Sequence, residues 1–435
     1  MITEMKRWIA VWLAFLTIMG GMMDAVNVSR NANAVSNKTQ ALPSSRSKLY
    51  RLHDPIYING NDNFTYANGV TSGNGTQEKP YIIENWEIDL SNPRVGAGII
   101  IMNTDAYFVI RNCLLYNGWR GYWKESNHGI LFYFVQNGAI ENITSYDNYY
   151  GLWLDSSSNN RIANCVVYNN KRGIYLDEAK HSQITSCNVY NNLFEGISLY
   201  SSSNTSITDC TFYNNEQGVY LSWNSDNNRI TNCCVYNNSQ KGIELRFSLN
   251  NRIEKCYCYN NCEYGISFVA SPNNTIINCT ISNSDRGVYL HSSSNNNITN
   301  SAIYNNSNGI YLHSSSNNNT ICYNQFIDNC EHFRDEGSNY WYDNEFIKLG
   351  KAGEKSWLSW LRENRVLIAF LIVLIFIALA LTKIGITSAR KVERLRGFYP
   401  DQLKCVYCQE TTKITSRERP LLFQCPKCGG KSVMK

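Results

Sequence analysis

The sequence contains little proline, little charge and few histidines. Only 8 prolines and 6 histidines occur among 435 residues, and charged residues make up 17%. So few prolines leave long stretches of hydrogen-bonded backbone uninterrupted. The net charge of +5 is unevenly divided, because residues 383–435 hold 12 Lys/Arg against 4 Asp/Glu, a net of +8. The rest of the chain is therefore mildly acidic (−3), and no dense acidic or Arg/Lys cluster surrounds its one candidate pair of catalytic carboxylates, Asp155 and Asp177.

What the sequence does contain is a repeat of 22 to 24 residues, from residue 81 to about 345. The unit reads Gly-Ile/Val-x-Leu, a Ser/Asn-rich turn, and then Ile-x-x-Cys-x-Val-Tyr-Asn-Asn, as in GIYLDEAKHSQITSCNVYNN from Gly173. Short runs with apolar residues at i and i+2, bounded by Gly and Asn/Ser, are typical of strands. Strand units stacked on copies of themselves predict a parallel β-helix. The units open at Gly129, Gly151, Gly173, Gly196, Gly218, Gly242, Gly265, Gly287 and Gly309.

The repeat also predicts which side chains face the core. Ile174 and Leu176 share one face of a strand, and Cys187 and Val189 share another, because residues two apart point the same way. The Cys187 position recurs in about eleven rungs, which predicts a rod of ~50 Å. We expect residues 26–80 to form a linker and N-terminal cap (the cap from Tyr50), 81–346 the β-helix, and Asp335–Phe346 a C-terminal cap. The inward column contains Trp86, Cys113, Ile143, Cys165, Cys187, Cys210, Cys233, Cys256, Cys279, Ser301 and Asn324.

This pattern resembles the right-handed parallel β-helix repeats of NosD-type and carbohydrate-binding or sugar-hydrolase families. The segment NGVTSGNGTQEKPYIIENWEID, Asn68 to Asp89, is similar to the start of many archaeal surface β-helix proteins. The resemblance covers about two-thirds of the chain and implies a right-handed β-helix. Through NosD proteins it also raises a role in copper-site maturation. One departure is that the inward column, usually Asn in such families, is mostly Cys here.

Two hydrophobic segments flank the repeats. Residues 1–25 have the charged start and short apolar run of a signal peptide, with an uncleaved anchor as the alternative. Residues 366–382 are uncharged and mostly apolar, which predicts a membrane-spanning helix after a juxtamembrane linker, 347–365. A buried core helix is the alternative, but a β-helix has no place for one. The basic linker at 383–400 favours a cytoplasmic C-terminus and an extracellular β-helix.

The C-terminal residues 401–435 hold two CxxC motifs separated by sixteen residues: Cys405, Cys408, Cys425 and Cys428. This spacing is typical of a zinc ribbon with structural Zn²⁺, and rubredoxin-like iron is the alternative. A closed site of four cysteines has no open position for catalysis. The basic tail could contact nucleic acid, anionic lipid headgroups or an unknown acidic cytoplasmic partner, or it could be a solvated positive flank.

The remaining twelve cysteines are interpreted mainly as packing residues, since a buried free cysteine behaves as a small hydrophobe. A thiol column that binds Cu(I) is the alternative. Twelve Asn-x-Ser/Thr sequons, among them Asn142, Asn204, Asn273 and Asn305, are compatible with an extracellular glycoprotein.

Function is predicted from the outward positions two and four residues after each repeat glycine. They form two columns with aromatic rings for sugar stacking and polar groups for sugar hydroxyls; aromatic residues that simply suit a sheet surface are the alternative. The expected binding residues are Trp153, Tyr175, Tyr220, Asp155, Asp177 and Arg246.

Three functions compete on this evidence. We favour a surface module that binds glycans or a cell-surface partner over a polysaccharide-cleaving enzyme and over a NosD-like metal accessory protein. Asp155 and Asp177 are the candidate catalytic pair for an enzyme, whereas His291 and His313 make at most half a metal site. The insertion around Trp119 and Trp123 is the alternative location of the binding site.

Overall fold

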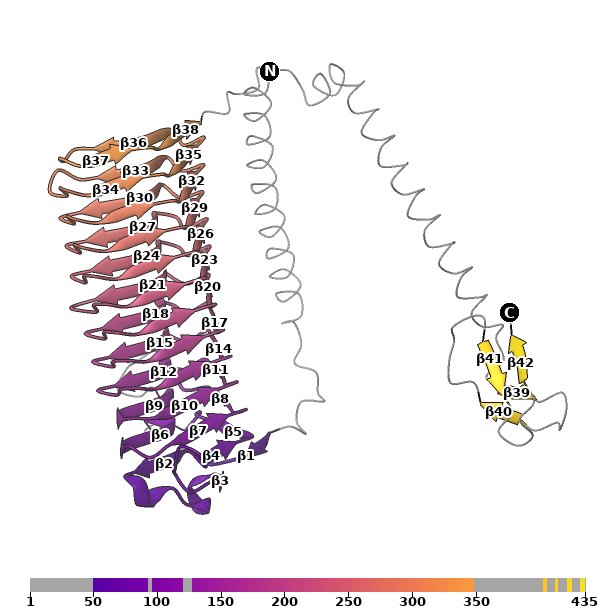
Figure 1. Ribbon diagram of the computed structural model, residues 1–435. Helices are drawn as coiled ribbons and strands as arrows, with labels where there is room; N and C mark the ends of the chain where they lie inside the picture. The colour runs from indigo at the N-terminus through magenta and orange to yellow at the C-terminus, as the bar shows by residue number, and fades with distance from the viewer. Residues whose placement is uncertain are drawn as a thin grey trace. The chain divides into compact units, whose positions relative to one another are not determined.

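The computed structural model describes residues 50–92, 96–119 and 127–347, and four short strands between residues 402 and 434. Residues 50–347 form a right-handed parallel β-solenoid of about eleven turns (Figure 1). The predicted signal peptide, the linkers at 26–49 and 348–400 and the predicted membrane span lie outside the described residues. Among the residues that are described, no helix is long and apolar enough to cross a membrane.

Each turn contributes one strand to each of three sheets. In a typical turn β12 (Tyr150–Asp155) of sheet B leads to β13 (Arg161–Ala163) of sheet C and β14 (Val166–Tyr168) of sheet A. The next strand, β15 (Arg172–Asp177), then pairs in parallel with β12. Sheet B contains twelve strands. They are β2 (Ile56–Asn59), β6 (Ala97–Thr104), β9 (His128–Val135), β12, β15, β18 (Glu195–Tyr200), β21 (Gln217–Ser222), β24 (Lys241–Arg246), β27 (Tyr264–Val269), β30 (Arg286–His291), β33 (Asn308–Leu312) and β36 (Glu331–Asp335).

Sheets A and C contain thirteen strands each. Sheet C holds β3 (Val70–Ser72), β4 (Tyr81–Glu84), β7 (Phe108–Arg111), β10 (Gly138–Glu141), β13, β16 (Gln183–Thr185), β19 (Ser206–Thr208), β22 (Arg229–Thr231), β25 (Arg252–Glu254), β28 (Thr275–Ile277), β31 (Asn297–Thr299), β34 (Thr320–Cys322) and β37 (Tyr340–Tyr342). Sheet A holds β1 (Arg51–Leu52), β5 (Trp86–Asp89), β8 (Leu114–Tyr116), β11 (Thr144–Tyr146), β14, β17 (Asn188–Tyr190), β20 (Thr211–Tyr213), β23 (Cys234–Tyr236), β26 (Tyr257–Tyr259), β29 (Thr280–Ser282), β32 (Ala302–Tyr304), β35 (Gln325–Ile327) and β38 (Glu345–Ile347).

The core is a column of apolar side chains one rung wide. Ile174, Leu176, Ile184 and Val189 are fully buried, and Cys187 is 2% exposed. The predicted inward positions are therefore confirmed. Because each side chain stacks on its equivalent one rung away, the same residue types recur along the whole rod.

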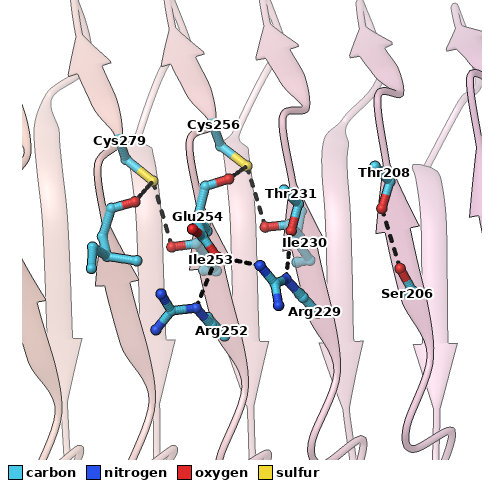
Figure 2. A network of polar contacts seen from close by, with 11 residues as sticks. Ser206, Thr208, Arg229, Ile230, Thr231, Arg252, Ile253, Glu254, Cys256 and Cys279 are labelled. Atoms are coloured by element: carbon cyan, nitrogen blue, oxygen red, sulfur yellow. Dashed lines mark hydrogen bonds and ion pairs between the residues drawn. The ribbon is translucent and has the colours of Figure 1, made fainter.

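The cysteine column lies at the corner between sheets C and A. Cys256 Sγ lies 3.6 Å from the carbonyl oxygen of Ile230 in the preceding rung and 3.4 Å from that of Glu254 (Figure 2). Later in the same column, Asn324 donates its side-chain amide to the equivalent carbonyl of Ile298 at 2.8 Å. The thiols thus occupy the place of an amide donor, and all twelve cysteines in the solenoid are free.

A ladder of buried asparagines forms the corner between sheets A and B. The backbone N–H and side-chain amide of Asn192 both donate to Asn215 Oδ1, at 2.9 and 3.0 Å, and Asn215 repeats this with Asn238. The ladder supplies partners for backbone groups that the turn removes from the sheets. The next rung and the ladder leave no room beside the repeat glycine, since a Cβ on Gly173 would lie 2.3 Å from the carbonyl oxygen of Gly196 and 3.0 Å from the side-chain nitrogen of Asn192.

Both predicted caps contribute strands to the solenoid. Within Tyr50–Pro80, β1 and β2 pair in parallel with β5 and β6, and only β3 pairs antiparallel, with β4. Two 3-10 helices, η2 (Asn61–Asn63) and η3 (Tyr66–Asn68), complete this end. At the other end β37 and β38 pair in parallel with β34 and β35, and Asn344 repeats the inward role of Asn324.

A second compact unit spans residues 350–435. It contains two antiparallel hairpins, β39 (Gln402–Lys404) with β40 (Thr411–Lys413) and β41 (Leu421–Gln424) with β42 (Lys431–Met434). One CxxC motif falls in the sequence between the strands of each hairpin, although the four cysteines themselves lie outside the described residues.

Candidate functional site

The outer face of sheet B carries the predicted columns. Trp153 is paired in register with Tyr175, and Asp155 with Asp177. The register continues through every later rung, so the two columns run straight along the rod. Their side chains differ in accessibility: Ser198, Glu244 and Ser267 are buried, whereas Tyr200 and Arg246 are exposed.

A third column on this face was missed by the sequence analysis. It consists of the residue immediately before each repeat glycine, and each such residue begins a sheet B strand. In the middle of the solenoid the column runs Tyr150, Arg172, Glu195, Gln217, Lys241, Tyr264, Arg286. Its signal in the sequence is the recurrence of charged and aromatic residues just before the glycines.

An aromatic cluster occupies the N-terminal part of the face. Tyr150 lies 5.2 Å from Trp153 and 5.1 Å from Tyr175, measured between ring centroids. His128 contacts the same cluster, 5.0 Å from Tyr150 and 4.9 Å from Trp153. Burial lowers the pKa of His128 to about 4, so this imidazole is neutral at pH 7 and acts as part of the aromatic cluster.

Two carboxyl groups with raised pKa values, those of Asp155 and Asp177, lie beside this cluster. Burial raises the pKa of both Asp155 and Asp177, and the negative charge of Asp155 raises that of Asp177 further. Asp155 accepts a hydrogen bond from Ser156 Oγ at 2.8 Å, and Tyr175 donates its hydroxyl to Asp177 at 3.3 Å. These are hydrogen-bonding groups beside half-buried aromatic rings, an arrangement suited to a polyhydroxylated ligand.

The six predicted binding residues are not all neighbours. The structure brings together Trp153, Tyr175, Asp155 and Asp177. Tyr220 lies two rungs beyond Tyr175, about 10 Å away, and Arg246 lies three rungs beyond Asp177, about 14 Å away. Tyr220 and Arg246 therefore reach only a ligand that extends along the rod.

Most positive charge in the third column is neutralised within the protein. Arg172 forms an ion pair with Glu195 at 3.1 Å, and Lys241 forms one with Glu244 at 2.9 Å. Both acids are buried, so these pairs stabilise the sheet surface.

The C-terminal part of the face holds a second group of aromatic and basic residues. Tyr289 lies 5.5 Å from Tyr311, and His291 lies 4.5 Å from His313, between ring centroids. His291 and His313 are neighbours in the second column, as predicted.

In the alternative binding region, Trp119 is half-buried, and Trp123 lies outside the described residues.

Comparison with known proteins places the chain in a family. The family model described as periplasmic copper-binding protein (NosD) matches residues 31–215, 122–273 and 195–351, which together span most of the chain. The chain belongs to the NosD family. No curated protein matches it.

Solved structures share the fold of this NosD-family chain. The periplasmic alginate epimerase AlgG is 14% identical, with a TM-score of 0.51 over 61% of this chain and 78% of that one. The A-module of the Azotobacter vinelandii mannuronan C-5 epimerase AlgE6 is 15% identical, with a TM-score of 0.50 over 62% of this chain and 88% of that one. At this identity the likeness concerns the fold alone.

The described residues of this NosD-family chain do not fit a copper site. They contain no group of three or more His, Cys, Asp or Glu side chains placed to hold a metal ion. The cysteine column is a line of thiols hydrogen-bonded to carbonyls, and burial raises the pKa of Cys113 to about 12. Burial also raises the pKa of Cys165 well above its ordinary range, so a metal-binding thiolate is disfavoured at these two positions.

Proposed function

We propose that this protein displays a glycan-binding surface outside the cell, and that the outer face of sheet B is that surface. The observation that carries the proposal is the cluster of Trp153, Tyr150 and Tyr175 beside Asp155 and Asp177. Aromatic rings offer apolar faces to sugar rings, and carboxylates accept hydrogen bonds from sugar hydroxyls.

The topology in this proposal comes from the flanking sequences. Residues 1–25 direct export, 366–382 anchor the chain in the bilayer, and the basic residues that follow keep the C-terminus in the cytoplasm. There Cys405, Cys408, Cys425 and Cys428 hold a structural zinc ion in a ribbon. The sequon asparagines Asn142, Asn204, Asn273 and Asn305 are exposed, which leaves them open to glycosylation.

A glycan array probed with the full-length protein in detergent tests the proposal. Tyr175→Ser is the sharpest variant, because Ser198 and Ser267 already occupy the same column, so the sheet tolerates serine there. We expect the affinity for the bound glycan to fall about tenfold when this ring is lost. Tyr257→Thr is the matched control, since it removes an exposed aromatic ring from sheet A instead. Equal binding by wild type and Tyr175→Ser would move the site away from this cluster.

Polysaccharide cleavage is the second candidate, and the raised pKa values of Asp155 and Asp177 favour it. Their strands are register neighbours ~4.8 Å apart, close to the ~5 Å that separates the two carboxyl groups of retaining glycosidases. The same array, followed by analysis of released fragments, distinguishes the two functions. An enzyme releases fragments and Asp155→Asn abolishes that release, whereas a binding module releases none.

A further inference from the structure

Arg286 lies in a cage of tyrosines at the C-terminal part of the sheet B face. Its guanidinium carbon is 5.3 Å from the ring centroid of Tyr264 and 5.1 Å from those of both Tyr289 and Tyr311. Arg286 Nη1 also donates to the Tyr264 hydroxyl at 2.9 Å. These contacts hold the planar guanidinium in one orientation beside the half-buried tyrosine rings.

The charge of Arg286 differs from the other charges in its column. Arg172 and Lys241 each have a carboxylate partner, at 3.1 and 2.9 Å. Within the solenoid as described, Arg286 has no ion-pair partner, and its column neighbours are Tyr264 and Asn308. Its Nε is buried and has no hydrogen-bond partner among the described residues. A half-buried guanidinium with an unused donor is costly unless something else supplies the acceptor.

The nearby acid does not supply that acceptor. Glu336 accepts hydrogen bonds from the Tyr311 hydroxyl at 3.0 Å and from Arg334 Nε at 2.9 Å. Arg334 in turn lies 5.0 Å from the centroid of Tyr311, so this tyrosine ring contacts two guanidinium groups. Among the described residues, this region therefore presents aromatic rings together with one cation, Arg286, that has no carboxylate partner.

We infer that Arg286 binds the anionic group of an acidic polysaccharide, with Tyr289 and Tyr311 beside the sugar rings. This inference rests on the proposed function and names its ligand class. A guanidinium binds a carboxylate or sulfate through paired hydrogen bonds, and the tyrosine cage has already oriented it. Arg286 lies five rungs from the Tyr175 rung, roughly 24 Å along the same face. A polysaccharide that runs parallel to the solenoid axis contacts both regions.

Binding of three polymers to the full-length protein tests the inference: polygalacturonate, dextran sulfate and neutral dextran. We expect one or both polyanions to bind more tightly than dextran, and their relative affinities identify carboxylate or sulfate as the preferred group. Arg286→Gln should weaken polyanion binding at least tenfold, and Arg286→Lys should weaken it less. Arg161→Gln is the control, because it removes an equal charge from the exposed surface of sheet C.

The thermal midpoint separates loss of binding from loss of folding, and the glycan array separates this inference from the proposed function. The thermal midpoint of each variant shows whether the solenoid survives, and Arg286→Lys decides the question if Arg286→Gln does not fold. Unchanged polyanion affinity in a folded Arg286 variant would overturn the inference. So would wild-type protein that binds neutral glycans on the array but neither polyanion, and the proposed function would then still stand. Failure to bind any glycan would overturn both.

Discussion

Three kinds of donor occupy equivalent places along the inner column between sheets C and A. Cys279 Sγ lies 3.6 Å from the carbonyl oxygen of Ile253, Ser301 donates to Thr299, and Asn324 donates to Ile298 at 2.8 Å. The position requires a small buried side chain that can donate a hydrogen bond to a backbone carbonyl. A thiol meets that need with a weak hydrogen bond and good apolar packing. This explains why cysteine replaces the asparagine expected from the family pattern.

The chemistry of this column predicts opposite outcomes for two substitutions at Cys210, which is 1% exposed. Cys210→Ser should cost at most about 1 kcal/mol, because the hydroxyl keeps a donor and serine occurs at this position in a later rung. Cys210→Arg should cost at least ~3 kcal/mol, because it places an unpaired charge in the core. Denaturant unfolding of the full-length protein measures both. An Arg variant as stable as wild type would mean that the column faces solvent.

The alternation of side chains along a strand was enough to predict the columns of Trp153 and Asp155, but not the column of Arg172 and Arg286. Around each repeat glycine two consecutive residues face inward, as with Gly173 and Ile174, and simple alternation fails there. The tight fit of the glycine against the next rung causes this local exception. Ion pairs such as that of Arg172 with Glu195 join residues one rung apart, and strand periodicity alone does not predict which residues pair in this way.

At the scale of the element, sheet A carries a feature that no single repeat reveals. Its last outward position is tyrosine in seven successive rungs, and neighbouring rings are stacked. Tyr190 and Tyr213 lie 4.8 Å apart between centroids, and Tyr213 and Tyr236 lie 5.0 Å apart with an angle of 1° between rings. The sequence shows the Val-Tyr-Asn-Asn motif, yet the stack exists only because exact parallel register places equivalent rings above one another. The series is Tyr116, Tyr146, Tyr168, Tyr190, Tyr213, Tyr236 and Tyr259.

The stack predicts that an interior tyrosine contributes more to stability than an isolated one. Tyr213→Ser removes a ring with a stacked neighbour on each side, and we expect a loss of about 1–3 kcal/mol. Tyr304→Ser is the comparison, because Ser282 separates Tyr304 from the stack in the same column. Its loss should be smaller by about 1 kcal/mol in the same unfolding experiment. Equal losses would show that burial alone, and not ring stacking, stabilises the sheet.

At the scale of the whole molecule, the recurring inward position of Cys187 predicted the number of turns, but the repeat did not predict how the ends are built. The terminal rungs lack the repeat glycine, so β1 and β2 within Tyr50–Pro80 have no periodic signal. They join the sheets because their apolar residues, such as Ile56 and Ile58, still alternate and extend the core.

For the sequon asparagines, in contrast, the sequence motif does not by itself indicate glycosylation. Asn204 and Asn273 have φ of 57° and 60°, so the turn itself favours asparagine there with or without glycosylation.

The accessibility of the cysteines tests the membrane topology of the molecule. Cys262 and Cys330 are free and exposed on the solenoid, whereas Cys405, Cys408, Cys425 and Cys428 belong to the C-terminal unit. If the solenoid is outside the cell and the tail inside, a membrane-impermeant thiol reagent on intact cells should label the first pair and none of the four. Labelling of the tail cysteines from outside would contradict the proposed orientation.

The zinc ion proposed for the C-terminal cysteines is measured in the purified full-length protein. The two CxxC motifs fall between the paired strands of two hairpins, which is where the knuckles of a zinc ribbon would be placed. We expect one zinc ion per chain, and its loss in Cys405→Ser and Cys425→Ser, because removing one thiolate of four opens the tetrahedral site. Cys262→Ser should retain the zinc and serves as the control. Stoichiometric iron in its place would identify a rubredoxin-like centre, and zinc that survives both tail substitutions would place the ion elsewhere in the chain.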